Sequence, residues 1–168
     1  MTETIRVAER GRVIEFSFED MMKYHGGGSP AGVAAAYKVL QRAFDVVSPD
    51  EAPQRRSIAV RTAFRGPGAR DGFELVTRAV TDDRYTIDVA LARPDRGRLL
   101  QSFVFEVHIG DRWVTLLLRD GFVTEEFIDL AGKDQRTEPE ESRLDELKAQ
   151  LAEKVMGADA ADVYELGG

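Results

Sequence analysis

The chain has 168 residues, 43% of them hydrophobic and 32% charged, which fits one ordinary globular domain with a sizeable core. Its net charge of −7 argues against non-specific binding to nucleic acid or to an anionic membrane surface, because both require a basic face. The absence of cysteine excludes disulfides, thiolate metal sites and a cysteine nucleophile.

Short elements are expected before the first glycine run. Residues 1–11 carry no clear pattern and are expected to be a loose lead-in. Residues 13–18 alternate apolar and polar side chains, which predicts a short strand. Ser17 followed three residues later by Asp20 is a helix-capping pattern, so a brief helix is expected over 18–24.

A long central helix is expected over about 30–44. Ser29 and Pro30 are residue types favoured at the N-cap and at the first position of a helix. Apolar residues then recur at the spacing of one buried helical stripe: Val33, Ala36, Tyr37, Leu40 and Phe44. This stripe predicts that the helix packs on a sheet.

The middle of the chain alternates strands with a helix. Residues 57–64 read as a strand, and 65–70, which are rich in glycine and proline, as a loop. Asp71 with Glu74 is a second capping pattern, which predicts that a helix opens there. A further strand is expected over about 85–91.

The clearest pairing in the sequence is a hairpin. Residues 99–109 and 113–118 are both strand-like, and Gly110-Asp111-Arg112 separates them as a turn. Residues 124–131 then predict a short helix that ends at Gly132.

The C-terminal part predicts one more helix. Residues 133–138 are charged and read as a linker, and Thr137 with Glu140 forms a capping box. A narrow apolar stripe follows, which is typical of packing on a partner helix or on the flank of the domain: Leu144, Leu147, Leu151 and Val155. The stripe predicts a homodimer. Residues 158–168 are expected to be frayed.

These elements predict an α+β fold, with a mixed or mostly antiparallel sheet packed against a long central helix and an extra C-terminal helix. The expected division is a domain over 1–132 and a linker with a C-terminal helix over 133–168. No apolar run reaches the roughly 18 residues of a membrane span, and the polar start is unlike a signal peptide, so we expect a cytoplasmic protein.

The stretch from Tyr24 to Gly32 is the strongest candidate for a site. Three glycines allow close backbone approach, and the helix start that follows presents N–H groups suited to an anion or a polarised carbonyl. His25, one of only two histidines, could transfer a proton there, or it could be a neutral residue bonded to a backbone carbonyl. His108 alternates with apolar residues and reads as a sheet-surface residue.

Other polar residues near this stretch have two interpretations each. Ser29 is explained by N-capping, or it acts as a nucleophile with His25 as its base. Asp71 and Glu74 cap a helix, or they form a carboxylate pair in the same pocket. Arginines flank this second pair and could clamp a carboxylate or phosphate, although most arginines are solvated: Arg61, Arg65, Arg70 and Arg78.

Two stretches resemble the formylmethanofuran dehydrogenase E-like domain family. That family has Phe-His-Gly-His-x-Cys-Pro-Gly at the start of its long helix, and this chain has Tyr24-His25-Gly26-Gly27-Gly28-Ser29-Pro30-Ala31. A second family motif has a Cys three residues before an Asp and a Gln three residues after it. Here the matching positions hold Gly68, Asp71 and Glu74. The resemblance covers about residues 13–130.

The resemblance implies the fold and the location of a pocket, but it does not carry over the metal. The Cys and His residues of the family look like metal ligands. In this chain Gly27, Ser29 and Gly68 occupy three of those positions, and of that set only His25 remains. We therefore expect no metal and no other cofactor.

Two functions follow from these observations. The first is a metal-independent enzyme for a small anionic or carbonyl-bearing molecule, of isomerase, lyase or hydrolase type, in which His25, Asp71 and Ser29 are catalytic. The substrate would be bound by the glycine-rich loop and its neighbours: Tyr24, Gly26, Gly27, Gly28, Arg70 and Glu74. The alternative is a non-catalytic protein for binding or assembly that lost the family's metal site.

Overall fold

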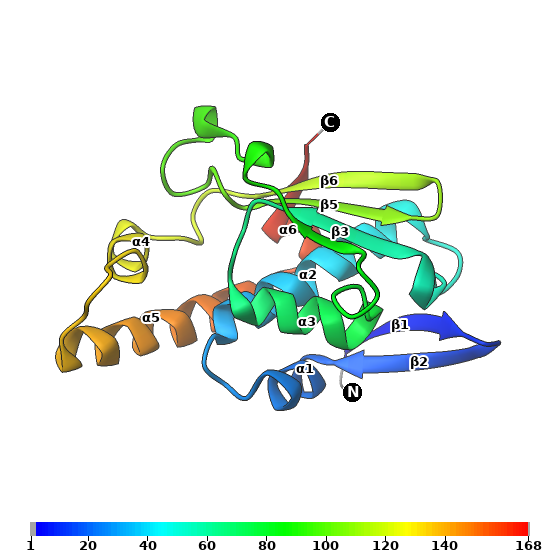
Figure 1. Ribbon diagram of the computed structural model, residues 1–168, viewed down its shortest axis with the longest axis horizontal. Helices are drawn as coiled ribbons and strands as arrows, with labels where there is room; N and C mark the ends of the chain where they lie inside the picture. Colours follow the sequence, from blue (N-terminus) through cyan, green and yellow to red (C-terminus); the bar gives the residue numbers. More distant parts are fainter. Residues whose placement is uncertain (1–2, 168) are drawn as a thin grey trace.

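A five-stranded mixed sheet forms the upper layer of the fold in Figure 1, which draws a computed structural model that describes residues 3–167. The strand order is β4-β3-β5-β6-β7, in which β3 and β4 are parallel and the other pairs antiparallel. The strands are β3 (Ile58–Thr62), β4 (Tyr85–Ile87), β5 (Val104–Ile109), β6 (Arg112–Leu118) and β7 (Tyr164–Leu166). The expected α+β class is thereby confirmed.

The helices lie mainly below this sheet in Figure 1. They are α1 (Phe18–His25), α2 (Pro30–Val47), α3 (Pro67–Thr77), α4 (Glu125–Ala131), α5 (Glu138–Met156) and α6 (Ala160–Val163). Three short 3-10 turns cover Arg55–Ser57, Val89–Leu91 and Pro94–Arg96. No helix within residues 3–167 combines the length and the apolar character needed to cross a lipid bilayer.

Helix α2 is the central helix that the sequence predicts. It begins at Pro30 as expected and runs to Val47, three residues past the expected end at Phe44. Its apolar stripe is buried, with Leu40 fully buried and Phe44 8% exposed. Every residue from 31 to 40 is buried, because α3, α5 and the sheet all pack on this helix.

Glycines let α2 and α3 approach closely. A Cβ added at Gly32 would lie 2.8 Å from the backbone nitrogen of Ala69, and one at Gly68 would overlap the backbone oxygen of Ser29. A Cβ at Gly72 would lie 2.9 Å from the Ala36 side chain. The contact therefore requires glycine at these positions, since a real Cβ almost never comes within 3.0 Å of another heavy atom.

The N-terminal segment differs from expectation. The lead-in over 1–11 is wrong from residue 4 onward, because β1 (Thr4–Glu9) pairs antiparallel with β2 (Arg12–Ser17) in a separate hairpin; residues 1 and 2 lie outside the described residues. Ile5 and Val7 of β1 are buried in the core, which explains why the segment is ordered. The capping pattern of Ser17 with Asp20 is confirmed as a capping box that opens α1.

The start of α3 also differs. The helix begins at Pro67, so the expected loop over 65–70 and the helix opening at Asp71 are wrong. Proline suits the first position of a helix because its missing N–H would have had no partner there, and Gly66 is the N-cap. Asp71 and Glu74 consequently lie inside the helix and do not cap its start.

Two strands in the second half of the chain are shorter than predicted. The strand expected over 85–91 ends at Ile87 and a 3-10 turn follows it, and the strand expected over 99–109 begins only at Val104. The β5–β6 hairpin is confirmed, with Val107 opposite Val114. Thr124 caps α4, which ends at Gly132 as expected. Thr137 and Glu140 form the predicted capping box of α5.

The C-terminal segment joins the same core as the rest of the chain. The expected fraying over 158–168 is wrong as far as residue 167, where the described part of the chain ends, because α6 is followed by β7, which pairs with β6. Tyr164 is fully buried, and its hydroxyl donates to the backbone oxygen of Ala35 at 3.3 Å. The apolar stripe of α5 packs on α2 and α4, so Leu144, Leu147 and Val155 are already covered within one chain. The stripe on which the homodimer prediction depends is therefore not an exposed interface.

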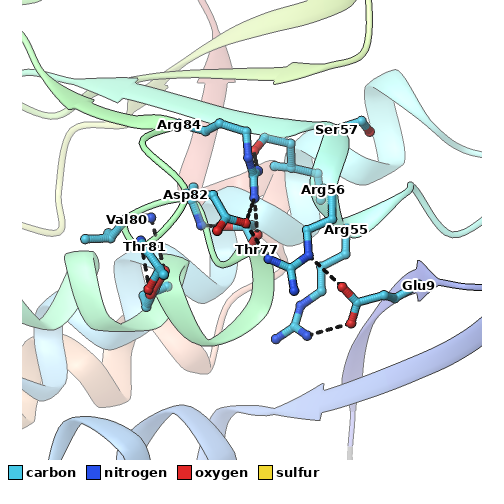
Figure 2. Close-up of polar contacts among 12 residues, drawn as sticks. Glu9, Arg55, Arg56, Ser57, Thr77, Val80, Thr81, Asp82 and Arg84 are labelled. Carbon is cyan, nitrogen blue, oxygen red and sulfur yellow. Dashed lines mark hydrogen bonds and ion pairs between the residues drawn. The ribbon is translucent and has the colours of Figure 1, made fainter.

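Arginines fasten the far end of α3 to its neighbours (Figure 2). Arg55 donates to the carbonyl oxygens of Leu75 at 2.7 Å and Val76 at 2.9 Å, which belong to the last turn of α3. It also pairs with Glu9 of β1 at 3.1 Å, and Arg56 pairs with the same carboxylate at 2.6 Å. The β1–β2 hairpin is thus held to α3 by charge-assisted hydrogen bonds.

The same network lowers the pKa values of its carboxyl groups. Arg56 is the largest cause for Glu9, and Arg55 lowers that pKa further. For Asp82 the largest cause of the lowered pKa is again the hydrogen bond from Arg56, followed by that from Arg84. Both carboxyl groups are therefore more easily ionised in the folded chain than in the unfolded one.

We expect this network to weaken on acidification. Because the pKa of Glu9 is lower in the folded chain, its stabilisation is present above the unfolded value of about 4 and is lost as the pH falls through the folded value. Urea unfolding of the wild type and Glu9→Gln between about pH 7 and about pH 3 measures this. The variant should unfold at lower urea near neutral pH, and the difference should shrink toward acid. A difference that does not depend on pH would contradict the assignment.

Candidate functional site

The structure brings three of the predicted site residues together. Nδ1 of His25, at the end of α1, lies 2.8 Å from a carboxylate oxygen of Asp71 in α3. Nε2 of the same ring accepts a hydrogen bond of 2.9 Å from the backbone N–H of Ser29. The imidazole thus links α1, α3 and the N-cap of α2, and its side chain is only 8% exposed.

These two bonds define the proton arrangement of the ring. Nε2 accepts from an N–H group, so in this arrangement the proton of a neutral imidazole lies on Nδ1 and is donated to Asp71. Both nitrogens are therefore occupied by protein groups. A proton-transfer role would require the loop to move, so that Nε2 parts from Ser29.

The glycine run forms the turn between α1 and α2. Gly26 caps α1 in the left-handed conformation, with φ of 92°, and Gly27 has φ of 91°. Gly28 has no such requirement, but its backbone oxygen accepts a hydrogen bond of 3.2 Å from Nζ of Lys148 in α5. Tyr24 is 53% exposed at the end of α1.

Two other predicted site residues, Arg70 and Glu74, form no hydrogen bond with His25. Arg70 is mostly exposed, with its guanidinium 3.9 Å from Asp71. Glu74 is buried, and its carboxylate accepts hydrogen bonds from the backbone N–H groups of Val80 and Thr81. Figure 2 labels Val80 and Thr81 in the turn after α3. Glu74 thus stabilises the turn after α3 and is not joined to the His25–Asp71 pair.

A cavity of about 680 Å³ lies beside this cluster, between the start of α2, the start of α3, α4 and α5. Of the predicted catalytic and substrate-binding residues only Ser29 lines it, whereas His25 and Asp71 do not. Its wall is mainly apolar and includes Phe64, Leu99, Phe103, Leu118, Val123, Phe127, Ile128, Leu144, Leu151, Val155 and Tyr164. Burial raises the pKa of the Tyr164 phenol, so this residue is a neutral part of the wall.

The polar lining of the cavity is cationic or neutral. It contains Arg65, Arg98, Arg136 and Lys148 together with hydroxyl and amide groups, and no Asp or Glu of residues 3–167 lines it. Arg98 pairs with Asp129, and Arg136 pairs with Glu141. Neither Arg65 nor Lys148 forms an ion pair with any residue from 3 to 167.

Most residues that line this cavity cannot be predicted from the sequence. Lys148 stands at i+4 from Leu144 and i−3 from Leu151, so it lies on the apolar stripe of α5. A lysine on such a stripe is the available signal, although a snorkelling surface residue gives the same pattern. From the sequence, Arg65 is only one of several arginines near the second motif.

The metal of the resembling family does not fit these residues. Gly68 packs against the backbone of Ser29, and both nitrogens of His25 are engaged. Within residues 3–167, no three histidine or carboxylate side chains are placed to hold a metal ion. Comparison of the chain with models of known protein families and with curated proteins gave no match.

Proposed function

We propose that this protein binds a small molecule with an apolar body and an anionic or carbonyl group in the cavity between α2, α4 and α5. A cavity of about 680 Å³ is of the size that binds small organic ligands, and such sites are typically apolar with a few polar groups that fix orientation. The glycine loop is next to this cavity, since Ser29 both lines the cavity and bonds to His25.

The absence of acidic residues from the described lining carries the proposal. The chain has 30 acidic and 23 basic residues, yet the charged side chains that line the cavity are all basic. An anionic ligand is favoured in such surroundings because cations and backbone N–H groups compensate its charge as it leaves water. Ala31 and Gly32, in the first turn of α2, lie in the same wall.

The direct test of this proposal is to fill the cavity with a larger side chain and to measure ligand binding. Anilinonaphthalene sulfonate, a fluorescent molecule with apolar rings and one negative charge, should bind the wild type at a single saturable site. Leu151→Trp, which places an indole in the cavity, should weaken this binding about tenfold or more, because filling the volume removes the apolar contacts. Gln150→Trp is the matched control, since Gln150 is exposed on α5 and does not line the cavity.

Folding must be checked beside binding in this experiment. Far-ultraviolet circular dichroism and thermal unfolding establish that each variant is folded, because the same dye also binds loosely packed states. Ala131→Trp, on the exposed side of α4, is a second way to obstruct the cavity with little risk to the core. Equal binding by the wild type and by both cavity variants would overturn the proposal.

Enzymatic activity is the second candidate function. The observation that favours it is the chain of contacts from Asp71 through His25 to Ser29, since a carboxylate that orients an imidazole is the usual support of a general base. In this mechanism a ligand at Ser29 would displace the loop and free Nε2 for proton transfer. The binding function needs no such movement, and for that reason we place it first.

A further inference from the structure

The two uncompensated cations, Arg65 and Lys148, line the cavity near Ser29. Lys148 reaches the backbone oxygen of Gly28, next to Ser29, and Ser29 in turn packs against Gly68 at the start of α3. Arg65 immediately precedes the N-cap of α3, so it belongs to the same region. The hydroxyl of Ser29 makes no capping hydrogen bond to α2, which leaves it available to a ligand.

The wall that α5 contributes to the cavity is apolar on the C-terminal side of Lys148. From Lys148 to Val155 this wall is about 10 Å long, at a rise of 1.5 Å per residue. Beyond Lys148 this wall carries Leu151 and Val155, and the buried side chains of Leu118 and Tyr164 line the cavity with them. Such a wall favours an apolar chain in proportion to the methylene groups that the chain buries.

We propose that the ligand is a linear amphipathic anion whose oxyanion head group lies between Arg65 and Lys148 beside Ser29. Its apolar chain runs along α5 toward Val155 and Tyr164. The hydrogen bond from Lys148 to the backbone oxygen of Gly28 brings no anionic partner to its ammonium group, because that oxygen is a neutral carbonyl. A carboxylate or a phosphate can each accept from the ammonium, the guanidinium and the hydroxyl group, so both head groups satisfy the same chemistry.

This inference rests on the proposed binding function and can fail separately from it. Isothermal titration of the wild type with decanoate, decyl phosphate, decanol and decylamine compares four head groups on one chain. We expect decanoate or decyl phosphate to bind about tenfold to a hundredfold more tightly than decanol, as charged hydrogen bonds allow. The tighter of the two anions identifies the head group.

Variants locate the head group. Lys148→Met and Arg65→Gln should each reduce the preference for the anion over decanol about tenfold, and Lys148→Arg should largely restore it. Arg98→Gln tests another position for the head group, because Arg98 also lines the cavity but is paired with Asp129. Arg112→Gln is the control, since Arg112 is exposed on β6 and does not line the cavity. Its preference should match that of the wild type.

The outcomes separate the two proposals. If decanol binds as tightly as both anions, the cavity is a binding site but the head-group assignment is wrong. If the anion preference is lost in Arg98→Gln and kept in Lys148→Met, the head group lies elsewhere in the cavity and the inference is again overturned. If none of the four compounds binds, both this inference and the proposed function are overturned.

Discussion

Gly68→Ala is expected to be among the most destabilising single substitutions in this protein. The new Cβ would overlap the backbone oxygen of Ser29 and lie 3.0 Å from the backbone nitrogen of Val33. Backbone atoms of a buried helix cannot yield as a flexible side chain can, so α2 and α3 must separate. Overpacking of this kind costs about 3 kcal/mol or more, which lowers Tm by roughly 6–12 °C for a chain of this size.

The matched control is Gly28→Ala, in the glycine run itself. An added Cβ there has the ring of His25 at 4.0 Å as its nearest neighbour, and the backbone does not require positive φ. Thermal unfolding should therefore leave this variant within about 1 kcal/mol of the wild type. Equal stability of the Gly68 and Gly28 variants would show that the two helices are not in close contact at Gly68.

The elements with local signals could be predicted from sequence. The β5–β6 hairpin has its turn residues between two apolar runs, and α2 has both a start signal and a long stripe. The start of α3 could not be predicted because Gly66-Pro67-Gly68 has the composition of a loop. Gly68 is required by the close contact between α3 and α2. A requirement that comes from tertiary packing produces no periodic pattern in the sequence.

The candidate site could be predicted only in part, for a similar reason. The contact between His25 and Asp71 joins residues 46 positions apart, and no local spacing pattern connects them. The cavity is assembled from the starts of α2 and α3, the segment over 98–103, α4 and α5. Lys148 and Gly28 are in contact because α5 packs along α2. A single sequence does not show which helices pack on each other.

His25→Ala is expected to destabilise the protein as well as to alter its site. The substitution removes the acceptor of the Ser29 N–H and the partner of the Asp71 carboxylate, in a place where the imidazole is only 8% exposed. Leaving such groups without partners costs about 1–3 kcal/mol. Asp71→Asn should cost less, since its amide oxygen can still accept from Nδ1. Urea unfolding measures both values.

A double-mutant cycle with His25→Ala and Asp71→Ala isolates the pair. If the two side chains stabilise the loop through their mutual bond, the double variant should lose less stability than the sum of the single variants, by about 0.5–3 kcal/mol. Gln150→Ala combined with His25→Ala is the control, since Gln150 is exposed on α5 and forms no hydrogen bond with His25, so its effect should simply add. Additive losses for His25 and Asp71 would contradict the contact.

The same variants separate binding from catalysis. Once a ligand of the cavity is known, a general acid or base at His25 predicts that His25→Ala lowers turnover roughly 10²–10⁴-fold, far more than its stability loss explains. A purely structural pair predicts that ligand affinity changes only as the start of α2 and Ser29 shift, and that Asp71→Asn retains most of it. Loss of turnover in a folded His25→Ala variant that still binds its ligand would favour the enzyme, because the bound geometry would then be intact and only proton transfer missing.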